Sequence, residues 1–226
     1  SKMATMGEMI GVIAHQLKQP LNILSLYCND VSDSFFSNEI NNKFIDDFSK
    51  NTKEQINFLS ETIDDFRDFF NPNKQKVVFE IKSAIEKSLK FMGNQFEINR
   101  VKVNIEYKDE KVYGIEIELE QVILNILNNS MDAFKERKIE NKEINIKVLS
   151  KQSYTILIME DNAGGVKEES LEKIFDPYYT TKSTGTGTGL YMVKLVVKNS
   201  LQGDLKINNS EKGLRYIIAL PQKEES

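Results

Sequence analysis

The stretch IELEQVILNILNNSMDAFKER, residues 117–137, decides the fold of this 226-residue chain. Its apolar residues recur three and four positions apart, which predicts a helix with a buried face. Asn125 and Asn129 are spaced i, i+4 in this helix, so their amides share one face. Such a pair could hold a hydrated magnesium ion through side-chain oxygens, with phosphates as further ligands, or could be two ordinary capping or surface amides.

Short strand patterns and further helices flank this helix. The predicted strands are VVFEI (77–81), VKVNIEY (101–107), KVYG (111–114), EINIKVLS (143–150), YTILIMED (154–161), GDLKIN (203–208) and RYIIALP (215–221). The strands at 143–150 and 154–161 are expected to pair antiparallel. Helical patterns cover 82–92 and 189–200. This order predicts an α/β sandwich over residues 73–226, with helices packed on one face of a mixed sheet.

The first 70 residues are helical throughout by their pattern. One apolar stripe contains Ile10, Ile13, Leu17, Leu21, Leu24, Val31 and Phe35, and a second runs from Ile45 to Phe70 at heptad-like spacing. The polar run SNEINN, 37–42, separates them, and Pro72 ends the second. A lone hairpin has too little core, so residues 1–72 are predicted to form a dimeric four-helix bundle, which makes the whole chain α+β.

Composition excludes several classes of protein. The net charge is −4, with 30 basic and 34 acidic residues, so no general attraction to nucleic acid is expected. No stretch of 18 uncharged apolar residues occurs, and no signal peptide is visible, so membrane contact is not expected. Cys28 is the only cysteine, which rules out an internal disulfide and fits a reducing compartment such as the cytoplasm.

The stretch GVIAHQLKQPLN, residues 11–22, contains the only histidine. At about 100° per residue, His15 lies about 160° from the centre of the apolar stripe, outside the predicted core. Pro20 has no N–H, so the carbonyl of Gln16 loses its helical partner and the helix is expected to kink or loosen there. That distortion could give a reactant access to the imidazole. An indifferent surface histidine beside a tolerated proline is the alternative.

A Gly- and Thr-rich segment, about 162–187, has the length of a functional lid. It runs into GTGTG, 185–189, where Gly185, Gly187 and Gly189 would let backbone amides approach an anion at the start of the next helix. The alternative is a flexible loop. No Walker motif occurs, and GTGTG is not a dinucleotide fingerprint. Lys182, in FDPYYTTK (175–182), could reach phosphate or could simply be solvated.

The stretch EDNAGG, 160–165, ends a buried strand with an acid followed by glycines. Asp161 could accept a hydrogen bond from the exocyclic amine of a base, and Gly165 could leave room for the ring. An ordinary Asx turn explains the same residues.

Together these stretches resemble the sensor histidine kinases of two-component systems. AHQLKQPLN resembles the H box, LEQVILNILNNSMDA the N box, MEDNAGGV and GTGTGLYM the two glycine boxes, and IFDPYYTTK the F-box region. Their order and spacing extend over essentially the whole chain. The resemblance implies a dimerisation and histidine-phosphotransfer hairpin over 1–72, and a Bergerat-type ATP-binding domain over 73–226.

The resemblance also implies site residues, cofactors and partners. His15 would be the phosphoacceptor, Asn129 would coordinate Mg²⁺, and Asp161 would contact the adenine of ATP. Asn125, Gly165, Lys182 and the three glycines of GTGTG would complete the nucleotide site. The implied activity is ATP-dependent autophosphorylation of a homodimer, followed by transfer to an aspartate of a response-regulator receiver domain. The chain would be the cytoplasmic part of a longer sensor.

Three positions depart from the family pattern. Gln16 stands where an acidic residue usually acts as a base on the imidazole, but its amide oxygen could still accept the Nδ1 proton. Gln19 stands where Thr or Asn is frequent in kinases that also dephosphorylate their partner, and Ala163 replaces a common glycine. These departures keep alternatives open: a Bergerat-fold ATPase without phosphohistidine, a catalytically silent ATP-binding dimeric scaffold, or a protein-serine kinase of the same ATP fold.

Overall fold

The computed structural model describes residues 2–37, 39–69, 75–181 and 187–224. The chain divides into two compact units, residues 1–73 and 74–226, called here the hairpin unit and the sheet unit. Within the residues described, no helix combines the length and the apolar character needed to cross a membrane.

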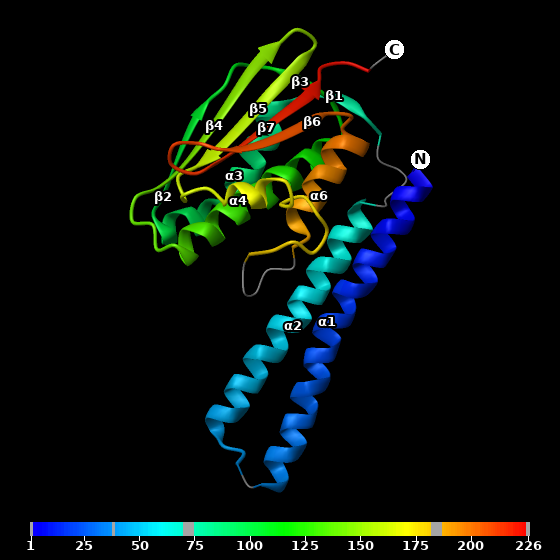
Figure 1. Ribbon diagram of the computed structural model, residues 1–226, viewed down its shortest axis with the longest axis vertical. Coiled ribbons are helices and arrows are strands. Elements are labelled where there is room, and N and C mark those ends of the chain that lie inside the picture. The colour runs from blue at the N-terminus through cyan, green and yellow to red at the C-terminus, as the bar shows by residue number, and fades with distance from the viewer. Residues whose placement is uncertain (1, 38, 70–74, 182–186, 225–226) are drawn as a thin grey trace. The chain divides into compact units, whose positions relative to one another are not determined.

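The hairpin unit consists of two long helices, α1 (Lys2–Phe36) and α2 (Asn42–Phe69), joined by a short turn (Figure 1). The side chain of Asn41 caps α2, because its Oδ1 accepts a hydrogen bond from the backbone N–H of Phe44 at 3.0 Å. Helix α1 is helical on both sides of Pro20, whose ring is buried. The proline is therefore accommodated without ending the helix.

Many large apolar side chains of the hairpin unit are exposed in a single chain. Among the side chains that the structure describes there, those at least 47% exposed are Leu21, Leu26, Phe35, Phe36, Ile45, Ile56 and Ile63. Leu21 and Phe35 belong to the apolar stripe of α1, and Ile45, Ile56 and Ile63 to that of α2. Two helices alone therefore cover only part of their own apolar stripes.

The sheet unit has a five-stranded sheet in the order β2-β4-β5-β7-β6. Its strands are β2 (Val101–Glu106), β4 (Lys142–Lys151), β5 (Tyr154–Asp161), β6 (Asp204–Asn209) and β7 (Leu214–Pro221). Strands β2 and β4 are parallel and every other pair is antiparallel, so the predicted mixed sheet and α+β class are confirmed. Strands β1 (Val77–Glu80) and β3 (Lys111–Gly114) form a separate antiparallel pair.

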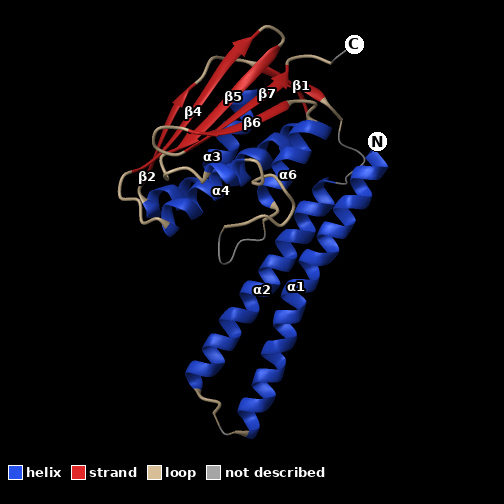
Figure 2. Cartoon of the chain, in the orientation of Figure 1, coloured by secondary structure: helices blue, strands red, loops and turns tan. Residues whose placement is uncertain are grey.

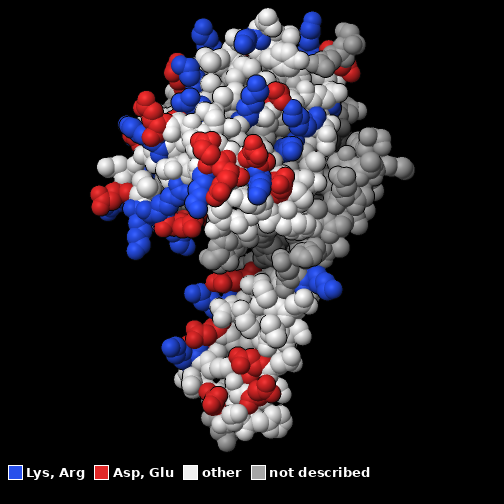
Figure 3. Space-filling model, in the orientation of Figure 1, with Lys and Arg blue, Asp and Glu red and all other residues white. Residues whose placement is uncertain are grey.

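Helices α3 (Ile81–Asn99), α4 (Glu116–Glu136) and α6 (Gly189–Leu195) lie on one face of the sheet (Figure 2). A short π-helix, Val196–Ser200, continues α6. The Gly- and Thr-rich segment 162–187, called here the lid segment, contains the one-turn helix α5 (Glu168–Leu171), which was not predicted. Lysine and arginine side chains are interspersed with aspartate and glutamate on the face of the sheet unit that Figure 3 shows.

The core lies between the sheet and α4. Buried residues alternate along β5, which places Leu157, Met159 and Asp161 on the helix side of the sheet. Met159 pairs with Ile146 of β4 and Tyr216 of β7, and α4 contributes Leu119, Val122, Ile123, Ile126 and Leu127 to the core. Each such buried side chain contributes about 1.5–3 kcal/mol. The same alternation that builds the core therefore carries an aspartate to its edge.

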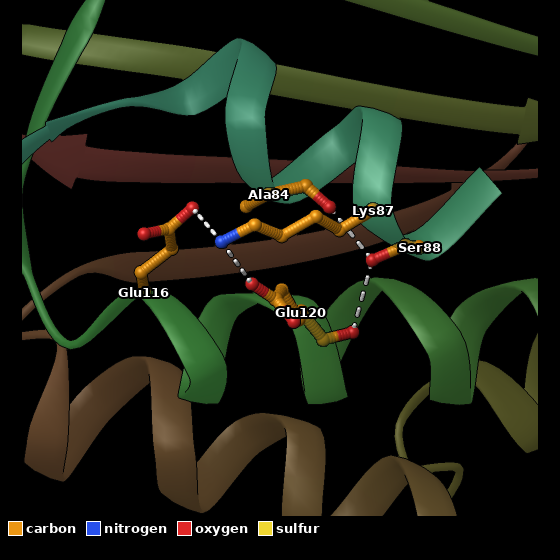
Figure 4. Close-up of polar contacts among 5 residues, drawn as sticks. All are labelled: Ala84, Lys87, Ser88, Glu116 and Glu120. Atoms are coloured by element: carbon orange, nitrogen blue, oxygen red, sulfur yellow. Dashed lines mark hydrogen bonds and ion pairs between the residues drawn. The ribbon is translucent and has the colours of Figure 1, made fainter. Parts of the chain in front are cut away.

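Helices α3 and α4 are also joined by a polar cluster, drawn in Figure 4. Lys87 Nζ lies 2.8 Å from Glu116 Oε1 and 3.3 Å from Glu120 Oε1, so one ammonium bridges two carboxylates one helical turn apart. Ser88 Oγ donates to the carbonyl of Ala84 at 2.8 Å. Partial burial alone would raise the pKa of Glu116, but hydrogen bonds from Lys87 and Ser83 outweigh it and lower that pKa.

Candidate functional site

The two predicted asparagines of α4 face the beginning of α6. Asn125 and Asn129 are half-buried, and Gly189 is the first residue of α6. A Cβ at Gly189 would lie 3.2 Å from Asn125 Oδ1 and 4.0 Å from Asn129 Nδ2. Asn125 Nδ2 donates to the carbonyl of Gln121 at 3.1 Å. The structure therefore brings Asn125, Asn129 and Gly189 together, and glycine keeps the space between the helices open.

Gly187 contacts the backbone of two consecutive tyrosines in the lid segment, Tyr178 and Tyr179. Its φ is +69°, and a Cβ there would lie 2.4 Å from the carbonyl carbon of Tyr178. Only glycine fits such a conformation at such a distance. The hydroxyl of Tyr179 donates a hydrogen bond to Ser170 Oγ in α5 at 2.8 Å. Lys194 of α6 lies over the ring of Phe175, 5.9 Å from its centroid. The described part of the lid segment, which includes α5, is therefore held by contacts within itself and with α6.

Asp161, the second centre of the site, is only 5% exposed. Its Oδ2 accepts a hydrogen bond from Ser130 Oγ at 3.0 Å, and its Oδ1 accepts one from the backbone N–H of Ala163 at 2.9 Å. The second contact is the Asx turn that was the alternative for EDNAGG, so the turn and the buried carboxylate coexist. Burial, and then the charge of Asp161, raise the pKa of the Tyr216 hydroxyl, which stays neutral.

Helix α4 links the two centres. Asn129 and Ser130 are consecutive residues of this helix. Asn129 lies near Gly189, whereas Ser130 binds Asp161. Ser130 was not predicted as a site residue, although a serine on the largely apolar buried face of the helix was the available signal. One helix therefore carries both the amides and the donor that orients the buried acid.

The glycine turn after Asp161 is held in an unusual backbone conformation. Gly164 and Gly165 have φ values of +89° and +66°. Arg137, at the end of α4, donates to the carbonyl of Ala163, and Asn162 Oδ1 accepts from the N–H of Glu143 at 2.9 Å. Ala163, the departure from the family pattern, is buried. Gly164 and Gly165 therefore lie in a turn that is held from several sides.

Other predicted site residues fall outside the described structure. Lys182 and Gly185 lie in 182–186, and the side chains of His15, Gln16 and Gln19 are likewise outside the described parts. Within the described residues, no group of three or more His, Cys, Asp or Glu side chains could hold a metal ion. Any metal bound among the described residues of the site would therefore be coordinated by amide oxygens together with waters or phosphate oxygens.

Comparison with known proteins extends this picture. Residues 114–224 match the family described as "Histidine kinase-, DNA gyrase B-, and HSP90-like ATPase". The two-component sensor PprA of Pseudomonas aeruginosa is 26% identical over 98% of this chain and 25% of its own length. The signal transduction histidine-protein kinase AtoS of Escherichia coli is 28% identical over 97% of this chain and 35% of its own length.

A solved structure shares the fold. The histidine kinase ThkA, crystallised in complex with the response regulator protein TrrA, superposes with a TM-score of 0.73 at 18% identity, covering 98% of this chain and 63% of that one. The chain spans only about a quarter to a third of PprA and AtoS. Residues 114–224 therefore form a domain that matches the histidine kinase-, DNA gyrase B- and HSP90-like ATPase family, and the two relatives named here are a two-component sensor and a signal transduction histidine-protein kinase.

Proposed function

We propose that this chain binds ATP in the sheet unit, phosphorylates His15 with it, and passes the phosphoryl group to an aspartate of a response regulator. The observation that carries the proposal is the arrangement around α4. Its consecutive residues Asn129 and Ser130 lie near Gly189 and Asp161, the places where phosphates and adenine would bind. A buried carboxylate at one end and an amide face at the other suit a ligand that has a base and a phosphate tail.

The residues present fit a magnesium ion. Asn125 Oδ1 lies beside Gly189, where even one added methyl group would fill the space. Amide oxygens are hard ligands of the kind that Mg²⁺ accepts, alongside waters and phosphate oxygens. In this proposal Asn129 holds the ion, and Asn125 lies beside it at the phosphates. Bound magnesium would offset the negative charge of the triphosphate.

At His15, the neutral imidazole would attack with Nε2, while the amide oxygen of Gln16 accepts a hydrogen bond from Nδ1–H and fixes the tautomer; the Nδ1 proton is lost to solvent after the transfer. A bond forms between Nε2 and the γ-phosphorus as the bond to the β,γ-bridging oxygen breaks, and ADP leaves. In the second step a carboxylate oxygen of the regulator attacks the phosphorus and the P–N bond breaks. Gln19 would orient a water that attacks the phosphoaspartate of the regulator and releases inorganic phosphate, which is the phosphatase activity.

The exposed apolar stripes of the hairpin unit support a homodimer. Leu21 is 54% exposed and Phe35 67% exposed, although both belong to the stripe predicted to face a core. A second hairpin would cover them in a four-helix bundle. The partner proposal, a response-regulator receiver domain, draws support from ThkA, which was crystallised with such a protein. We further propose that the reaction takes place in the cytoplasm.

The test is labelling with ATP that carries radioactive γ-phosphate. We expect label that is lost in acid and kept in alkali, which is the signature of phosphohistidine, and its complete loss in His15→Ala with ATP binding unchanged. Asn129→Ala should remove magnesium-dependent ATP binding. Wild-type labelling of His15→Ala would overturn the proposal. Steady ATP hydrolysis without labelled protein would favour the ATPase alternative, and bound ATP with neither reaction would favour the silent scaffold.

A further inference from the structure

We propose that the turn between β6 and β7, taken with the strand residues that flank it (209–214), positions the base-binding part of the site, and that Asn209 is its main positioning residue. The inference rests on the proposed binding of ATP at Asp161. No motif in the sequence marks this turn. It reaches the segment 161–166 through three separate contacts, each made by a different kind of group.

The first contact is the side-chain amide of Asn209. Its Oδ1 accepts a hydrogen bond from the backbone N–H of Val166 at 2.8 Å, and its Nδ2 donates to the carbonyl of Val166 at 2.7 Å. Nδ2 also lies 3.3 Å from Glu168 Oε1. The amide therefore satisfies both backbone groups of one residue, as a neighbouring strand would, and fixes the chain directly after the glycines.

The second contact holds the glycines themselves. A Cβ on Gly165 would lie 2.4 Å from Asn209 Oδ1, so the asparagine packs against the glycine backbone with no room for a side chain. The N–H of Gly164 donates to the carbonyl of Lys212 at 2.8 Å. Both glycines have positive φ values, which the turn thus maintains from one side.

The third contact reaches the acid. A Cβ on Gly213 would lie 2.0 Å from the backbone oxygen of Asp161 and 2.7 Å from its Oδ1. The backbone N–H of Leu214 points to the same carboxylate oxygen at 3.4 Å. Since any side chain at position 213 would displace Asp161, the close approach of this turn helps to set where the carboxylate lies.

Base selectivity follows from these contacts. Asp161 can distinguish an exocyclic amine from a carbonyl oxygen only if its carboxylate and the space at Gly165 keep their relative positions. The substitution Asn209→Asp keeps the size of the side chain and the acceptor for Val166 N–H. It replaces the donor with an oxygen that faces the Val166 carbonyl, so the segment should shift while the core of the sheet unit remains.

The experiment measures the affinity of the whole chain, with Mg²⁺, for ATP and for inosine triphosphate, whose ring has an oxygen in place of the amine. We expect Asn209→Asp to weaken ATP binding roughly tenfold and inosine triphosphate binding much less, so that the preference for ATP falls. Asn104→Asp is the matched control. It removes an exposed side-chain hydrogen bond from Asn104 on β2 to Asn145 on β4. Strand β2 is at the opposite edge of the sheet from β6, so the preference for ATP should be unchanged.

Measurements are made below the unfolding midpoint of each variant, and Asn209→Ser provides a second, smaller change if Asn209→Asp unfolds. A folded Asn209 variant with the wild-type preference for ATP would overturn the inference, because a merely structural role lowers stability without changing selectivity. Failure of the wild-type chain to bind ATP at all would instead overturn the proposed function. The two failures are therefore distinguishable.

Discussion

The hairpin unit and the sheet unit differ in how completely each buries its apolar residues. In the sheet unit, Leu119, Leu127 and Ile218 are fully buried in one chain. In the hairpin unit, Leu21, Phe35 and Ile56 are each about half exposed or more. The difference teaches that the sheet unit has a core of its own, whereas the described apolar side chains of the hairpin unit remain largely exposed in one chain. Stability of the first should therefore be independent of protein concentration, and that of the second should depend on it.

The largest expected effect comes from separating the units. Residues 74–226 alone should unfold cooperatively at a midpoint that does not change with concentration, because their core is complete. Residues 1–73 alone should lose helix on dilution, because two helices leave their stripes exposed. Circular dichroism over a hundredfold range of concentration measures both. A hairpin fragment that is monomeric and equally stable at every concentration would break the comparison.

A pair of leucine substitutions sharpens the comparison at single residues. Leu127→Ala in α4 should lower the free energy of unfolding of the sheet unit by about 2–5 kcal/mol, because it leaves a cavity in a closed core. Leu26→Ala, at a side chain 65% exposed and off the apolar stripe, should change stability by no more than about 0.5 kcal/mol. Denaturant unfolding measures each value, and equal costs would contradict the difference in burial.

The smallest effect should come from the polar cluster of Lys87, Glu116 and Glu120. The pKa of Glu116 is lowered in the folded state, so its contribution is present above the ordinary value of 4.5 and is lost as pH falls through the lowered pKa. Lys87→Met should therefore lower the unfolding midpoint slightly at pH 7 and by less at pH 2–3, because Glu116 loses its charge as pH falls through its lowered pKa. The effect is small because Lys87 is exposed to solvent. A large loss at pH 7, or an equal loss at pH 2–3, would show that the lysine acts through packing.

Local patterns were enough to predict most helices and strands, because the spacing of apolar residues determines which face of each is buried. The helix at 117–137 and the antiparallel pair β4–β5 were predicted this way. The short helix α5 was missed, because its four residues lie among turn formers and carry no period. The spacing of apolar residues in either segment did not predict that Asn125 lies close to Gly189. Only the family resemblance placed both residues in one nucleotide site.

The sequence by itself determined the class of the fold, the mixed sheet and the identity of Asn125, Asn129, Asp161 and Gly165 as candidates, because spacing and residue chemistry are local properties. Only the tertiary structure decided that Ser130 binds Asp161 and that Asn209 and Gly213 contact the segment 161–166. Those contacts join residues 31 to 53 positions apart in the chain. Such pairs meet because β5 and β7 are neighbours in the sheet and α4 packs across them, and no local pattern encodes that neighbourhood.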